Sequence, residues 1–183
     1  MSAIATAPEI THFWFTEIDP KAWFEKNDDF DEILRKRFGA TVQQALDGRL
    51  ADWAETAEGA MALILLLDQF TRNIYRDTPK AFAGDTQALK LCAHCREAGF
   101  FANVAPDWRR FILMPMMHSE DIAVQDASLP LFQKYTEEHT YGYAVRHRDI
   151  VARFGRFPHR NAILGRESSP EEVTFLAEPN SSF

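Results

Sequence analysis

The chain has 183 residues, of which 46% are hydrophobic, and its formal net charge is −7 at pH 7. This length fits one domain over residues 1–183 with a substantial core. The acidic balance argues against nucleic acid as a partner, because nucleic-acid-binding domains usually carry a basic surface. The longest apolar run, residues 60–67, is too short to cross a bilayer, so no membrane association is expected.

The first forty residues carry hydrophobic side chains at helical spacing. Ile10 and Trp14 belong to an amphipathic segment. Asn27 or Asp28 is predicted to cap a helix that Gly39 interrupts. The start of the chain lacks the basic residues and apolar run of a signal peptide, so a cytoplasmic location is expected.

The most apolar segment, residues 57–75, predicts a helix with apolar residues on every face, and therefore central burial. Thr78 followed by Pro79 predicts the start of the next helix, which ends at Ala98 before Gly99.

Further helices are predicted at residues 106–117, 119–137 and 141–154, the last ended by Gly155. Ser169 begins a capping box before a final helix. The sequence therefore predicts an all-α single domain of about seven to nine helices.

Asp68 is the first candidate catalytic residue, because it shares a helical face with apolar residues such as Ile64 and Leu65. A carboxylate on that face needs a partner, and Arg72 lies one turn away. Either the two form a structural buried ion pair, or Asp68 is a general base or orients one. Arg72 and the adjacent Asn73 are candidate ligand contacts.

His118, Ser119, Glu120 and Asp121 form a second polar group. Ser119 is predicted to cap the next helix, with both acids in its favourable first turn. His118 and Glu120 are alternatively acid/base groups. A metal site built from these two and His159 has no supporting spacing, so no metal is predicted.

The third group is a block of arginines between residues 141 and 166. This segment contains six of the fourteen arginines, none of the six lysines and a single acid, Asp149. Arginine holds carboxylates and phosphates in two-point contacts that lysine cannot make. The block therefore predicts either an anion site or a set of arginine struts between helices.

The helix at residues 141–154 divides these side chains between faces. His147 faces the interior with the apolar residues. Arg148 shares a stripe with Ala144 and Ala152, whose small side chains leave space, so Arg148 is predicted to be a ligand contact. A further stripe consists of Arg146, Asp149 and Arg153, and its spacing predicts a solvent-exposed face of ion pairs.

The loop after Gly155 concentrates polar side chains, which on a loop favour function. Its candidate ligand contacts are Arg156, His159, Arg160 and Asn161. The Cys92-Ala93-His94-Cys95 motif is interpreted as structural, because it lies inside a predicted helix and no second pair accompanies it.

The chain resembles the bacterial domain-of-unknown-function 924 family. Three segments carry the resemblance: ALILLLDQFTRNIYRDTPKAFAGD, FILMPMMHSEDIAVQDASLPLF and HRDIVARFGRFPHRNAILGRESSPEE. The family often has proline where Thr71 stands and glycine where Asp77 stands. The resemblance implies a tetratricopeptide-like all-helical fold and brings no activity. It places these residues in signature segments: Asp68, Gln69, Arg72, Asn73, His118, Ser119, Glu120, His147, Arg148, Arg156, His159, Arg160 and Asn161.

Two functions stay open. In the first, stacked helices form a concave face whose arginine, histidine and asparagine side chains bind a small anionic ligand or an acidic peptide. In the second, the chain is an enzyme with Asp68, His118 or Glu120 as acid/base and the arginines as an electrostatic clamp. A structural role for all these charges is the remaining reading. No cofactor is predicted.

Overall fold

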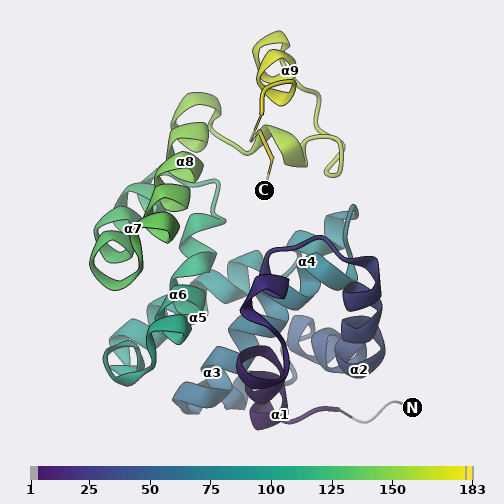
Figure 1. Cartoon of the computed structure of the whole chain (residues 1–183), viewed down its shortest axis with the longest axis vertical. Coiled ribbons are helices and arrows are strands. Elements are labelled where there is room, and N and C mark those ends of the chain that lie inside the picture. The colour runs from purple at the N-terminus through teal and green to yellow at the C-terminus, as the bar shows by residue number, and fades with distance from the viewer. Residues whose placement is uncertain (1–3, 180, 183) are drawn as a thin grey trace.

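The computed structural model describes residues 4–179, 181 and 182, and in these residues the fold is all-α (Figure 1). Because α3 and α4 belong to one continuous rod, the described residues form eight helices, as predicted. The α-helices are α1 (Ala7–His12), α2 (Asp28–Leu46), α3 (Ala57–Ile64), α4 (Thr71–Ile74), α5 (Asp85–Glu97), α6 (Pro106–Met117), α7 (Ile122–Tyr135), α8 (Glu138–Phe154) and α9 (Pro170–Leu176).

A central rod runs from α3 through a π-helical segment, Leu65–Phe70, into α4. Residues 60–67 are each at most 4% exposed, so the prediction of a central buried helix is confirmed. π-Helical turns inside α-helices are frequent at functional sites. Here the π segment contains Asp68 and Gln69, both buried.

Capping residues explain several helix starts. Asn27 caps α2 by accepting a hydrogen bond from Phe30 N at 3.0 Å, and Ser169 begins the predicted capping box of α9. The expected break at Gly39 was wrong, because α2 continues through it. Ser119 was also the wrong cap: Asp121 accepts from the amide of Ala123, and α7 begins at Ile122.

The predicted helix at residues 79–98 is divided in two. A 3-10 turn, Pro79–Phe82, precedes α5. Gly84 lies between them against the rod, where an added Cβ would be 2.2 Å from the carbonyl oxygen of Leu67. Just before this turn, Asp77 has a φ of 59°, in the left-handed region that favours glycine. This conformation would suit the glycine that the family resemblance implies at that position.

Helices α6, α7 and α8 pack in sequence order, with α7 and α8 side by side (Figure 1). α6 and α8 run in the same direction. Near their N-terminal ends, Arg110 and Glu137 are 3.8 Å apart. At the C-terminal end of α6, the ring of His118 lies beside that of His147 in the middle of α8, with centroids 6.2 Å apart. Corresponding turns of the two helices therefore face a shared space.

A small second hydrophobic cluster lies at the C-terminal end of α8. Ile150, Val151 and Phe157 are its buried members, and Phe175 of α9 packs on it. Within the described residues, no helix is long and apolar enough to cross a membrane.

Candidate functional site

A cavity with a volume of about 970 Å³ lies where six segments meet. They are residues 20–26, the end of the central rod, the turn before α5, α6, α8 and the loop after α8. Its lining includes seven lysine or arginine side chains, three acidic ones and four histidines. In a chain of net charge −7 the lining thus carries an excess of cationic side chains, of which Arg72 and Arg76 pair with carboxylates outside the lining. The cationic and histidine residues are Lys21, Lys26, Arg72, Arg76, Arg110, Arg146, Arg160, His118, His139, His147 and His159.

Arg160 is the most buried of these cations, with 6% of the residue exposed. Its guanidinium lies between the rings of Phe82 and Phe157, at 4.6 and 4.7 Å from their centroids. It donates to the carbonyl of His118 at 3.0 Å and, at a long 3.4 Å, to Asp85. Its buried Nε has no hydrogen-bond partner within the described part of the chain.

The charge of Arg160 is only partly offset by its neighbours. Asp85 also holds Arg72, through two hydrogen bonds of 2.9 and 3.1 Å. Burial, reinforced by Arg72, lowers the pKa of Arg160 to about 10, and Asp85 acts in the opposite direction. A bound anion would supply the missing negative charge.

Asp68 and His118 form a hydrogen-bonded pair with Nδ1 and Oδ1 2.8 Å apart. Asp68 is fully buried, and Arg72 Nη1 lies 3.4 Å from its carboxylate. Burial alone would raise the pKa of Asp68, but His118 and Arg72 more than offset it, so the pKa is lowered. An ionised Asp68 requires the proton on His118 Nδ1, which makes Nε2 the basic nitrogen of a ring that lines the cavity.

Burial lowers the pKa values of three histidines of the cavity, His118, His147 and His159. Burial, together with Arg72, lowers the pKa of His118, although Asp68 opposes the change. Burial and the neighbouring His118 lower the pKa of His147 to about 3. Burial and Arg160 lower that of His159 to about 4.

The polar residues of the rod are fixed by hydrogen bonds. Gln69 donates to Asp68 at 2.6 Å and contacts the sulfur of Met114 at 3.5 Å. Asn73 donates to the buried Asp31 at 2.7 Å, which also accepts two bonds from Arg76. The predicted pairing of Asp68 with Arg72 is confirmed, and both Arg72 and Asn73 line the cavity.

Four of the six arginines in the block serve as struts. Arg148 pairs with Asp126 at 2.7 Å and does not line the cavity. Arg156 makes two bonds to Glu172, whose pKa this pairing lowers to about 2. The other two pairs are Arg153 with Glu171 and Arg166 with Glu120.

The sequence predicted Arg148 as a ligand contact and Arg146 as part of a solvated ion-pair face. The structure instead places Arg146 in the cavity lining and Arg148 outside it. Arg146 lines the cavity, stacks 4.7 Å over Tyr143, and has no carboxylate within salt-bridge distance among the residues that the structure describes. Asp149, the expected partner of Arg146, instead contacts Arg148 at 3.3 Å. Of the alanines in the stripe of Arg148, Ala144 is fully buried by helix packing, whereas Ala152 is exposed.

Glu120 and Asn161 also lie outside the cavity lining. Glu120 accepts one hydrogen bond from the backbone N–H of Phe157 and two from the guanidinium of Arg166. Asn161 donates to Ser168 at 3.0 Å and is buried. Both residues hold the loop after α8 in place, and this loop carries His159 and Arg160 to the cavity.

Sequence reasoning missed several lining residues, notably Arg110, Met114 and Tyr143. The helical spacing of polar and methionine residues could have indicated these faces. Arg110, Met114, Met117 and His118 recur at helical spacing on one face of α6, and the set on α8 is His139, Tyr143, Arg146 and His147.

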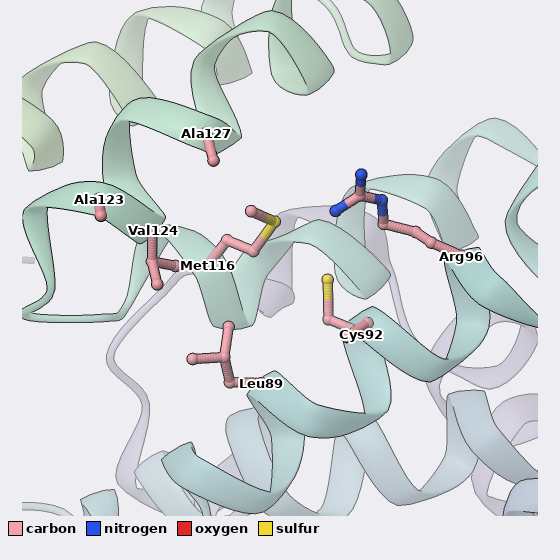
Figure 2. A pocket seen from close by; sticks show the side chains of 8 residues that line it. Leu89, Cys92, Arg96, Met116, Ala123, Val124 and Ala127 are labelled. Atoms are coloured by element: carbon pink, nitrogen blue, oxygen red, sulfur yellow. The ribbon is translucent and has the colours of Figure 1, made fainter.

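A second cavity, of about 330 Å³, lies between α5, α6 and α7 (Figure 2). Its lining is almost entirely apolar, with Cys92 and Met116 on its walls and Arg96 at its edge. Burial raises the pKa of Cys92 to about 12 and that of Cys95 to about 11. Both thiols are free and protonated, which fits the structural interpretation of their motif.

The chain belongs to the family of bacterial proteins of unknown function DUF924, whose model matches residues 10–180. Its structure is similar to that of ATU0120, a protein of unknown function from Agrobacterium tumefaciens, with a TM-score of 0.89 and 41% identity. The match covers 93% of this chain and 96% of that one. A comparison with curated proteins gave no match. In the described residues, no group of three or more His, Cys, Asp or Glu side chains is placed to hold a metal ion.

Proposed function

We propose that this chain binds a small anionic ligand in the cavity between α6, α8 and the central rod. The observation that supports this function best is Arg160, a buried cation in the cavity lining whose Nε is unpaired among the described residues. Folding rarely leaves a buried charge so incompletely offset, and a ligand carboxylate or phosphate would offset it.

Two further features support an anion over a neutral ligand. Lysines and arginines outnumber acids in the lining by seven to three. Arg146 is placed at the cavity without a carboxylate partner among the described residues. Its guanidinium is therefore available for a charge-assisted contact.

The test is a calorimetric titration of the protein with phosphate, sulfate and acetate at constant ionic strength. We expect saturable binding of one anion, weakened about tenfold in Arg146→Gln, because a charge-assisted hydrogen bond contributes about 1.5–3 kcal/mol. Arg148→Gln is the matched control, since it removes the same charge two residues away on the same helix but outside the cavity. Equal weakening in both variants, or no saturation, would contradict the proposal.

A second function, acid–base catalysis on the bound anion, is favoured by the Asp68–His118 pair. A carboxylate that holds a histidine in one tautomer is the arrangement of many general bases. His118→Asn keeps a donor toward Asp68 and removes the basic nitrogen. We infer that any hydrolysis of nitrophenyl phosphate or nitrophenyl esters by the wild type would be lost in this variant, while anion binding would persist. An absence of turnover in the wild type would leave the binding function alone.

The tetratricopeptide-like architecture belongs to the same proposal. The successive antiparallel packing of α6, α7 and α8 supports it, because arrays of helical pairs create the concave surfaces that bind ligands.

A further inference from the structure

The two ends of the cavity differ in chemistry. At one end, Arg72, His118, His147 and Arg160 gather within one network of contacts. At the other end, Arg110 lies 3.7 and 3.8 Å from the exposed carboxylates of Asp107 and Glu137, and its buried Nε also has no hydrogen-bond partner among the described residues. The His118 end holds two guanidinium groups, those of Arg72 and Arg160, whereas the other end holds one beside the lining carboxylate of Glu137, so a ligand anion is favoured at the His118 end.

The wall between these ends is apolar. Met114 and Met117 lie on α6 between Arg110 and His118, and Tyr143 is the counterpart on α8. Arg110 and His118 are eight residues apart, which corresponds to about 12 Å along the helix axis. Methionine side chains adapt to irregular ligand shapes because they are unbranched and polarizable.

Phe24 provides an aromatic group at the edge of this wall. It is 60% exposed, lines the cavity, and stacks on Phe111 with centroids 6.3 Å apart. Trp23, which is buried, lies beside it. A large exposed aromatic side chain over a cavity is suited to cover an apolar ligand surface.

We infer that the ligand is an amphipathic molecule with a single anionic head. Its carboxylate or phosphate head lies at Arg160 and His118, and its alkyl or aryl body lies along Met114 and Met117 toward Phe24. This inference rests on the proposed function, which requires only that an anion binds. An extended chain advances about 3.5 Å for every three bonds, so the wall accommodates a body about as long as that of octanoate.

The experiment is a calorimetric series of acetate, butanoate, hexanoate and octanoate, with phosphate and phenyl phosphate as a second pair. Complete burial of one methylene corresponds to about a fourfold change in Kd. Because the cavity is open, we expect a smaller total, about tenfold tighter binding from butanoate to octanoate. Phenyl phosphate should likewise bind more tightly than phosphate.

Two variants show whether this wall causes the trend. Phe24→Ser should flatten the dependence on chain length and leave the Kd for phosphate unchanged. Ile33→Ser is the matched control, because Ile33 is another exposed apolar residue, at 46% exposure, and lies outside the cavity. A flattening that is equal in both variants would indicate non-specific adsorption and overturn the inference.

The outcomes separate the two proposals. If no anion binds, the proposed function fails together with this inference. If anions bind but their Kd does not depend on the length of the alkyl chain, this inference is wrong and the proposed function stands. If the dianion suberate binds more tightly than octanoate, the far end also holds an anion, and a single charged head is the wrong description.

Discussion

Arg160 differs from the other arginines of its block in its burial and in its carboxylate partners. Its side chain is buried between two phenyl rings, and its nearest carboxylate is shared with Arg72. Four other arginines of the same block each have their own carboxylate. Residue type and local sequence do not distinguish these environments, because the partners come from α7, α9 and the turn before α7. The sequence alone could therefore predict the alternatives but could not assign each arginine.

The Asp68 carboxylate provides a test of the buried network. Asp68→Asn should lower the free energy of unfolding by about 3 kcal/mol, because the substitution removes a buried charge that Arg72 and His118 both contact. This value is at the low end of the range of about 3–5 kcal/mol for removing one partner of a buried ion pair, since Arg72 keeps Asp85 as a partner. Urea denaturation measures the change.

The control for this substitution is Asp126→Asn. Asp126 pairs with Arg148 at the surface, where ion pairs contribute little. A wild-type denaturation midpoint for Asp68→Asn would show that the buried pair is not important for stability.

His147 and His159 make stability depend on pH. Their folded-state pKa values, about 3 and about 4, lie below the ordinary value of 6.5. Between pH 4 and 6.5 the unfolded chain binds these protons and the folded chain does not, so stability falls as pH falls through this window. The loss is about 1.4 kcal/mol per pH unit for each histidine.

Urea midpoints at pH 7 and pH 5 check this dependence. His147→Gln should reduce the loss between the two pH values by up to about half, since His118 and His159 also have lowered pKa values and contribute the rest. His12→Gln, which replaces an exposed histidine on α1, is the control and should retain the full loss. An equal pH response in the wild type and His147→Gln would contradict the assignment.

At the scale of elements, capping and periodicity predicted most of the helices. The central rod, α6, the capping box of α9 and the end of α8 at Gly155 follow from local sequence. The prediction failed at Gly39, where α2 continues, and at residues 83–84, where the helix starts late. Both failures concern glycines whose role depends on tertiary neighbours: Gly39 has only a distant side-chain contact, whereas Gly84 touches the backbone of the rod.

Gly84 therefore offers a prediction about packing between elements. Gly84→Ala should destabilise the protein by about 1–3 kcal/mol, because its Cβ would overlap the carbonyl group of Leu67. Gly142→Ala is the matched control on α8, where a Cβ would have no neighbour within 4 Å among the described residues. The control should raise stability by about 0.5–1 kcal/mol through helix propensity. Thermal or urea denaturation of both variants decides whether Gly84 is required for close approach.

At the scale of the whole molecule, the parallel course of α6 and α8 creates the cavity. Neither helix reveals from its own sequence that the other lies opposite, and so Arg110, Met114 and Arg146 could not be assigned to the site. The family resemblance predicted the all-α fold and located His118, His147 and Arg160 in shared segments. It could not place them around one cavity, because their distance in space depends on the loop that Glu120 and Arg166 hold.

A crystal structure with selenate, an anomalous scatterer that replaces sulfate, tests the central claim most directly. We expect an anomalous peak in the cavity within about 3 Å of a guanidinium nitrogen of Arg160 or Arg146. In crystals of Arg146→Gln, soaked identically, the occupancy of that peak should fall, while crystals of Arg148→Gln should retain it. Peaks only at surface sites such as Arg148, with no anion in the cavity of the wild type, would contradict the account.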